Sequence, residues 1–157
     1  MKTLISLLFI FVFLVGCQQK TKTFYSVKAN VSNEVHPGKK LIETQCVICH
    51  SATASHDNRL APPMIAVKKR YASSNTTKKQ FIKDIQNWFD NPVEDNAKMY
   101  GAVKRFGVMP KLAITKENLN LISDYLYDND IDQPEWFEKH YNEEKRKGFP
   151  MHKLKQS

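Results

Sequence analysis

The sequence predicts an all-α fold, a small helical domain followed by one extra C-terminal helix. Apolar residues recur at the i, i+3, i+4, i+7 spacing of one helical face in two segments, residues 81–89 and 119–126. A threonine suited to cap a helix precedes each segment, Thr77 in the first case and Thr115 in the second. No stretch of useful length alternates apolar and polar residues as a half-buried strand does.

The N-terminal segment has the layout of an export signal. Lys2 precedes an apolar run that is too short for a membrane-spanning helix. The run ends in the sequence LVGC at Cys17, which resembles the cleavage box of bacterial lipoproteins. This resemblance implies that residues 1–16 are a signal peptide and that lipid on Cys17 anchors the protein to a membrane. The alternative is an ordinary signal followed by an incidental cysteine.

The folded part is expected to follow a tether. Residues 17–36 are polar and show no sustained period, which predicts a flexible segment. Pro37 suits the first position of a helix, so the domain is expected to begin there. Leu41 and Ile42 continue this helix at the right spacing towards residue 46.

The middle of the chain predicts alternating loops and helices. We expect a loop at 51–62, a short helix at 63–71, a longer helix at 77–91, a short helix at 92–100 and a loop at 101–113. The longer helix begins with a capping-box pattern, because a glutamine follows its threonine three residues later. The helix that follows Thr115 completes a domain of residues 37–128.

The motif that carries chemistry is Cys46-Val47-Ile48-Cys49-His50, a C-x-x-C-H run typical of c-type haem attachment. Two thiols can add across two vinyl groups of a porphyrin, and the imidazole that follows can then reach under the ring and bind the iron. If the run is helical, its i, i+3 spacing places both sulfurs on one face. A CxxC pair can also be a zinc half-site or a thioredoxin-like dithiol, so the rest of the chain has to decide.

The use of cysteine favours haem attachment. The chain has three cysteines, of which Cys17 would carry lipid while Cys46 and Cys49 would carry haem. No thiol is then left over, and a disulfide would sacrifice one of these roles. Export agrees with this interpretation, since c-type haem is joined outside the bacterial cytoplasm, and it argues against a cytosolic dithiol.

The chain is basic, with a formal net charge of +8. Removal of residues 1–16 would take away one lysine and no acidic residue, which leaves +7. A basic balance can indicate nucleic acid, but export argues against that partner. We expect instead a lysine-rich face that steers acidic redox partners, with an ordinary solvated surface as the alternative.

Residues 37–128 resemble the class I c-type cytochromes. The resemblance rests on the order of four features: Gly38 in the first helix, the C-x-x-C-H run, Pro62 twelve residues after His50, and Met109 followed by a proline before the last helix. It implies a small helical domain wrapped around one covalently bound haem c. A domain of this size has a thin apolar core, and the haem would supply much of the missing apolar volume.

The resemblance also implies roles for single residues. Gly38 would let the last helix cross close to the first, offering Leu121, Ile122 and Tyr125 from its side. The carbonyl of Pro62 would accept the N–H of the His50 imidazole, which fixes the tautomer and makes the ring a better ligand. Pro63 is the neighbouring choice.

Met109 is expected to be the sixth ligand of the iron, opposite His50. A thioether is soft and uncharged, so His/Met ligation raises the reduction potential. Met99 and Met64 are the alternatives, and methionine also commonly serves as core filler. A histidine in that position would instead lower the potential, and the tail offers His140 and His152.

The haem propionates need hydrogen-bond donors or positive charges as partners, and the sequence alone does not indicate which residues these are. Five residues qualify by their chemistry, Trp88, Tyr71, Arg59, Arg70 and Arg105.

Residues 129–157 extend beyond the class I pattern. Asp132 and Glu135 form a capping-box-like pair ahead of an aromatic face, and Gly148 and Pro150 would stop the helix. The aromatic face comprises Trp136, Phe137, His140 and Tyr141. This helix either packs onto the domain or docks a partner enzyme, and the residues after it are expected to be disordered.

The function expected from these features is that of a membrane-anchored mono-haem electron carrier, not an enzyme. Single electrons would pass through the haem edge between redox proteins, as in an oxidase or reductase system, without a small-molecule substrate. Lys104, Arg105 and Lys111 flank the Met109 loop and could orient an acidic partner. The alternative is a gas-sensing or ligand-binding module with a displaceable sixth ligand. In either case the protein would be exported and face the periplasm or the cell exterior.

Overall fold

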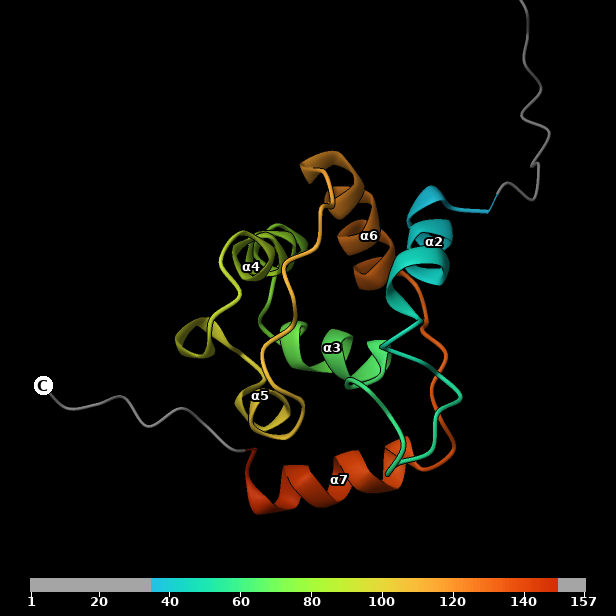
Figure 1. Ribbon diagram of the computed structural model, residues 1–157, viewed down its shortest axis with the longest axis vertical. Helices are drawn as coiled ribbons and strands as arrows, with labels where there is room; N and C mark the ends of the chain where they lie inside the picture. Colours follow the sequence, from blue (N-terminus) through green and yellow to red (C-terminus); the bar gives the residue numbers. More distant parts are fainter. Residues whose placement is uncertain (1–34, 150–157) are drawn as a thin grey trace, which may run out of the picture. The chain divides into compact units, whose positions relative to one another are not determined.

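The computed structural model describes residues 35–149, which form helices and no strand (Figure 1). The α-helices are α2 (Pro37–Leu41), α3 (Met64–Tyr71), α4 (Lys78–Asp90), α5 (Tyr100–Phe106), α6 (Lys116–Asp128) and α7 (Phe137–Lys147). A π-helical turn, η2 (Ile42–Cys46), continues α2, and a 3₁₀ turn, η3 (Glu94–Asn96), follows α4. The all-α prediction is confirmed for this part of the chain.

Several sequence predictions fall outside the described residues. They concern the signal peptide, the lipid on Cys17, the tether up to Glu34, and the end of the chain from Pro150 onward, with His152. Between residues 35 and 149, no helix combines the length and the apolar character needed to span a membrane.

Helix α2 packs against α6 with Gly38 at the crossing. A Cβ atom on Gly38 would lie 2.7 Å from the carbonyl carbon of Leu121 and 2.8 Å from Cβ of Tyr125. Since real Cβ atoms essentially never approach so closely, only glycine fits here. The predicted close crossing is confirmed, and Ile122 of the same helix is buried in the core.

His36, expected at the end of the tether, belongs to the folded part. Its Nδ1 accepts a hydrogen bond from the Gly38 amide at 3.0 Å and so caps the start of α2. Its Nε2 lies 3.5 Å from the Asp124 carboxylate of α6, and its ring packs on Tyr125. No periodic pattern around His36 predicts this contact, because the contact depends on α6, which comes much later in the chain.

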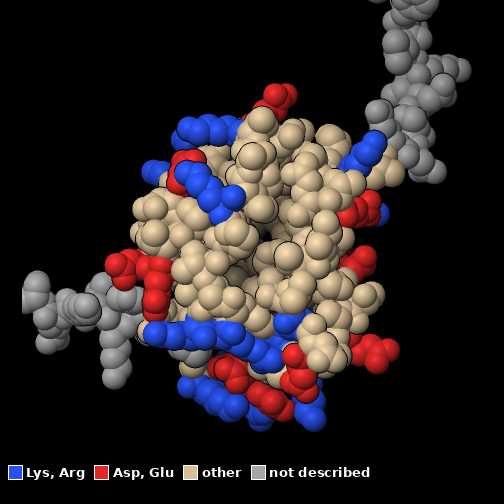
Figure 2. All heavy atoms as spheres, in the orientation of Figure 1, with Lys and Arg blue, Asp and Glu red and all other residues tan. Residues whose placement is uncertain are grey.

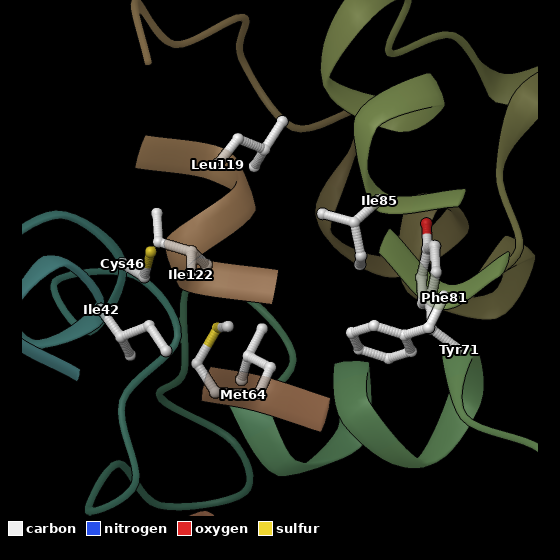
Figure 3. Packing of buried hydrophobic residues seen from close by; sticks show 9 residues of the cluster. Ile42, Cys46, Met64, Tyr71, Phe81, Ile85, Leu119 and Ile122 are labelled. Atoms are coloured by element: carbon white, nitrogen blue, oxygen red, sulfur yellow. The ribbon is translucent and has the colours of Figure 1, made fainter. Parts of the chain in front are cut away.

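The two apolar stripes of the sequence meet where α4 packs against α6. Phe81 and Ile85 of α4, with Leu119 and Leu126 of α6, are buried, and Phe81 is 0% exposed. Figure 3 shows the labelled core side chains lying around a common centre, with Cys46 among them.

Both predicted threonine caps are confirmed. The Thr77 hydroxyl accepts from the amide of Gln80 at 3.2 Å, and the Thr115 hydroxyl accepts from the amide of Asn118 at 3.2 Å. Each bond satisfies a backbone donor that the first turn of a helix leaves unpaired. The caps fix where α4 and α6 begin, and therefore which residues their apolar faces present to the core.

The segment between α4 and α6 differs from the prediction. A helix was expected at 92–100 and a loop at 101–113, whereas the structure has the short turn η3 within the first range and α5 from its last residue, Tyr100, into the second. The Asn96 side chain donates to the Asn91 carbonyl at 3.0 Å, which closes a turn where helix was expected. Gly107, with a φ of 80°, ends α5 in a conformation that glycine adopts readily.

Helix α7 exists as predicted but begins later. Its N-cap is Trp136 and has no side-chain cap, so Asp132 and Glu135 do not form the expected capping pair. The indole of Trp136 donates instead to the Ala54 carbonyl at 2.9 Å, which fixes the entry to the helix. Phe137 is 2% exposed, so the prediction that this helix packs onto the domain is confirmed.

Candidate functional site

The C-x-x-C-H run begins at Cys46, the last residue of η2, and continues as a tight turn rather than as a helix. The amides of Cys49 and His50 both donate to the Cys46 carbonyl, at 3.2 and 2.9 Å. Cys46 is 8% exposed and belongs to the core cluster, whereas Cys49 is exposed. One thiol is therefore held in an apolar environment and the other lies at the surface.

Burial changes the acidity of the inner thiol. Loss of solvation raises the pKa of Cys46 to about 11, because the thiolate is poorly stabilised among apolar neighbours. No disulfide joins Cys46 and Cys49 in the described part of the chain.

We expect the haem-free protein to react unevenly with iodoacetamide. At about pH 8 Cys49 should be alkylated first, because it is exposed, while Cys46 stays protonated and shielded. Peptide mass spectrometry over time measures the two rates, and Cys46 should catch up after unfolding in urea. Equal rates in the folded protein would contradict the buried position of Cys46.

His50 is oriented by the loop that follows it. Its Nδ1 lies 2.6 Å from the Pro62 carbonyl oxygen, which can only accept, so Nδ1–H is the donor. Desolvation lowers the pKa of His50, although the Pro62 hydrogen bond acts in the opposite direction. The neutral ring therefore keeps the lone pair of Nε2 for a metal.

The contact implied by the resemblance is present at Pro62 and not at its neighbour. Pro63 is the N-cap residue of α3, and its own carbonyl accepts the amide of Ala66 at 2.8 Å. The start of α3 thus turns the chain so that the preceding carbonyl is left for His50.

The three methionines considered as ligands lie in different settings. Met64 is buried in the core cluster, and Met99, at the N-cap of α5, packs against that cluster. Met109 lies half-buried in the loop after α5 and is not part of the cluster. It is the methionine of the three whose side chain is not already used in core packing.

A hollow marks the centre of the face seen in Figure 2. Uncharged residues surround it, and the lysines and arginines in view lie towards the margin. In the same orientation, Figure 1 places α3, α4 and α6 around this region. Such surroundings fit a flat apolar ring, whose charged substituents would have to reach the margin.

The residues considered as propionate partners differ in the contacts that they already make and in their burial. Arg70 donates to the Lys98 carbonyl at 2.7 Å, and burial raises the pKa of the Tyr71 hydroxyl. Arg59 differs, because its Nε is buried and has no hydrogen-bond partner within the described residues. Trp88 lines a polar depression at the end of α4 together with Asp84 and Lys98.

Comparison with known proteins identifies the class. The family model described as cytochrome c matches residues 35–130, and the chain belongs to this family. It is a c-type cytochrome, and its cofactor is covalently attached haem c with iron. No curated protein and no solved structure matches the chain.

The described residues contain no cluster for a structural zinc ion. No group of three or more His, Cys, Asp and Glu side chains between residues 35 and 149 is arranged to hold a metal. A structural zinc site commonly takes four such ligands, so the geometry gives the zinc interpretation of Cys46 and Cys49 no support.

Proposed function

We propose that the protein is a mono-haem electron carrier in which Cys46 and Cys49 hold the haem while His50 and Met109 bind its iron. The observation that carries the proposal is the 2.6 Å contact between Nδ1 of His50 and the Pro62 carbonyl, made by a half-buried ring. Haem held in this way supplies a centre that takes up and releases one electron.

The chain's own residues favour electron transfer over substrate binding. The Pro62 bond fixes the plane of the His50 ring, and the cap on α6 fixes the end of the loop that carries Met109. Two ligands held in this way would stay bound in both redox states, so little atomic rearrangement accompanies the transfer. The family match supports an electron carrier rather than an enzyme.

We place the partner surface at the Met109 loop. Val108 and Leu112 are exposed on either side of the methionine, and Lys111 donates to the backbone carbonyl of Asp90 at 3.1 Å and forms no ion pair within the described residues. An apolar patch with a positive charge beside it suits an acidic redox protein.

The other two cations expected to orient that partner are less available than the sequence indicates. Lys104 pairs with Glu94 at 3.2 Å, and Arg105 lies 3.9 Å from Asp57.

For location, we propose export and anchoring through lipid on Cys17, which rests on the LVGC sequence alone.

The ligand assignment predicts different spectra for two methionine variants. Met109→Ala should lose the far-red band of methionine bound to ferric iron, bind CO, and have a lower reduction potential. Met99→Ala is the matched control, because its side chain packs on the core, and it should keep the band. The absorption spectra of the two purified variants, with and without CO, test this.

Two results would change the assignment. Loss of the band only in Met99→Ala would make Met99 the ligand. A wild-type protein that is five-coordinate and binds CO readily would favour the gas-sensing or ligand-binding alternative.

A further inference from the structure

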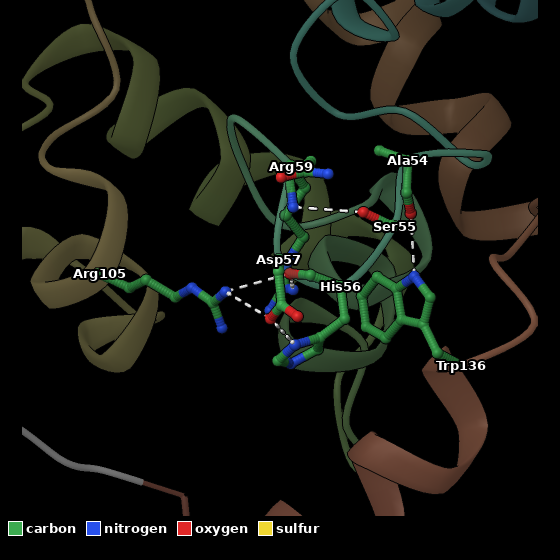
Figure 4. Close-up of polar contacts among 8 residues, drawn as sticks. Ala54, Ser55, His56, Asp57, Arg59, Arg105 and Trp136 are labelled. Carbon is green, nitrogen blue, oxygen red and sulfur yellow. Dashed lines mark hydrogen bonds and ion pairs between the residues drawn. The ribbon is translucent and has the colours of Figure 1, made fainter.

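Arg59 lies where three segments meet: the loop after His50, the end of α5, and the entry to α7 (Figure 4). Its guanidinium carbon is 5.3 Å from the ring centroid of Phe106 and 4.6 Å from that of Trp136. One of its terminal nitrogens donates to the His56 carbonyl. The side chain is thus held between an aromatic ring at the end of α5 and one at the residue that precedes α7.

The charges around Arg59 do not balance. Arg105 donates to the same His56 carbonyl at 3.1 Å, so two guanidinium groups lie close together. The carboxylate beside them is that of Asp57, which is 87% exposed and 3.9 Å from Arg105. Desolvation, followed by repulsion from Arg105, lowers the pKa of Arg59. The cluster formed by Arg59, Arg105 and Asp57 therefore has excess positive charge. Between residues 35 and 149, the buried Nε of Arg59 has no hydrogen-bond acceptor.

The position of Trp136 depends on α7, which lies beyond the residues that the cytochrome c model matches. The indole donates to the Ala54 carbonyl at 2.9 Å and packs edge-on against His56 at 5.1 Å. An ion pair of 3.0 Å between Lys69 of α3 and Glu138 holds the first turn of α7 to the domain.

This cluster touches both segments that carry the proposed iron ligands. Arg59 shortly precedes Pro62, whose carbonyl holds His50, and Phe106 ends the helix before the Met109 loop. The carboxylates of a haem would meet both needs of the cluster, since they supply negative charge and accept the free N–H of Arg59.

We propose that α7, through Trp136, holds Arg59 as a fixed positive charge beside the haem and so raises the reduction potential. The proposal rests on the proposed function above. One electron donated by a redox partner protein would lower the positive charge of the haem by one, and no bond or proton would have to move. A neighbouring cation therefore favours the reduced state. Arg59 supplies the charge, and Trp136 is a positioning residue.

Substitutions of Arg59 test whether its positive charge raises the reduction potential. Potentiometric titration of the purified holoprotein should show that Arg59→Gln lowers the equilibrium constant for reduction about tenfold, or about 59 mV for one electron. Arg59→Lys should recover part of this loss, because it restores the charge but not the planar stacking. Arg146→Gln removes the same charge from an exposed position on α7 and should leave the potential unchanged.

Substitutions of Trp136 test the positioning. Trp136→Ala should lower the potential in the same direction as Arg59→Gln, and the double variant should fall no further than Arg59→Gln alone. Trp136→Phe keeps a ring on the guanidinium but loses the bond to Ala54, so an intermediate potential is expected. If Trp136→Ala fails to fold, Trp136→Phe still tests whether Trp136 positions Arg59.

The possible failures are distinguishable. Unchanged potentials in the Arg59 and Trp136 variants, with haem bound, would overturn this inference and leave the electron carrier intact. A role of Trp136 in folding alone would lower the urea midpoint without moving the potential, which would also overturn it. Purified wild-type protein without covalent haem would overturn both proposals.

Discussion

Gly38→Ala is expected to lower the free energy of unfolding by about 3 kcal/mol, at the upper end of the range for overpacking. The added methyl group would collide with the backbone of Leu121, which cannot turn aside as a flexible side chain can. Helix α2 must then move away from α6, and the turn that carries Cys46 begins directly after α2. Urea denaturation of the holoprotein, followed by far-ultraviolet circular dichroism, measures the change.

Lys40→Ala is the matched control for this variant. Lys40 lies on the same short helix and is exposed, so its loss should change stability by no more than about 0.5 kcal/mol. Equal urea midpoints for the two variants would show that α2 and α6 do not cross as closely as the structure places them.

His50→Ala is expected to abolish the low-spin spectrum of the haem. The variant loses the proposed iron ligand, and it leaves the Pro62 carbonyl without its donor. An open coordination position should make the haem high-spin and able to bind CO, with a reduced yield of haem-loaded protein. Absorption spectra and haem staining after denaturing electrophoresis measure both effects.

His140→Ala provides the comparison for the loss of His50. Its ring lies against His56, with centroids 4.7 Å apart, in the contact between α7 and the loop after His50. We therefore expect an unchanged low-spin spectrum. A low-spin His50→Ala protein, or a His140→Ala protein that lost this state, would refute the assignment of His50.

The helices that pack against each other were predictable because each carries its own signal. In α4 and α6 a threonine cap and an apolar stripe agree about where the helix begins and which face is buried. Helix α5 has neither a capping side chain nor a buried residue, so a prediction from the spacing of apolar residues does not detect it. The signals that it does carry are Gly107 at its end and basic residues in its last turn.

The site also divides into residues that a local sequence signal predicts and residues that are placed by contacts far along the chain. Cys46, Cys49 and His50 lie within one run of five residues, and the position of Pro62 followed from a resemblance that includes spacing. The contact of Trp136 with the loop joins residues 82 positions apart, and nothing local in the sequence predicts it. The sequence places Arg59 among five equal candidates, whereas its setting in the structure depends on helices far along the chain.

The π-helical turn that ends at Cys46 sets the rotation about the helix axis between two residues with separate tasks. These are Gly38, where α2 crosses α6, and Cys46, the first cysteine of the C-x-x-C-H run. An α-helix turns about 100° per residue, so every fourth residue drifts about 40° around the axis. In η2 the Val47 amide instead bonds the Ile42 carbonyl at 3.1 Å, five residues back, and this wider turn winds more slowly. Gly38, Ile42 and Cys46 are consequently all buried. Deleting one residue of this turn would rotate the Cys46 thiol by about 100° relative to the face of α2 that crosses α6. The length of the turn therefore keeps Gly38 at the crossing and Cys46 on the same side of the helix.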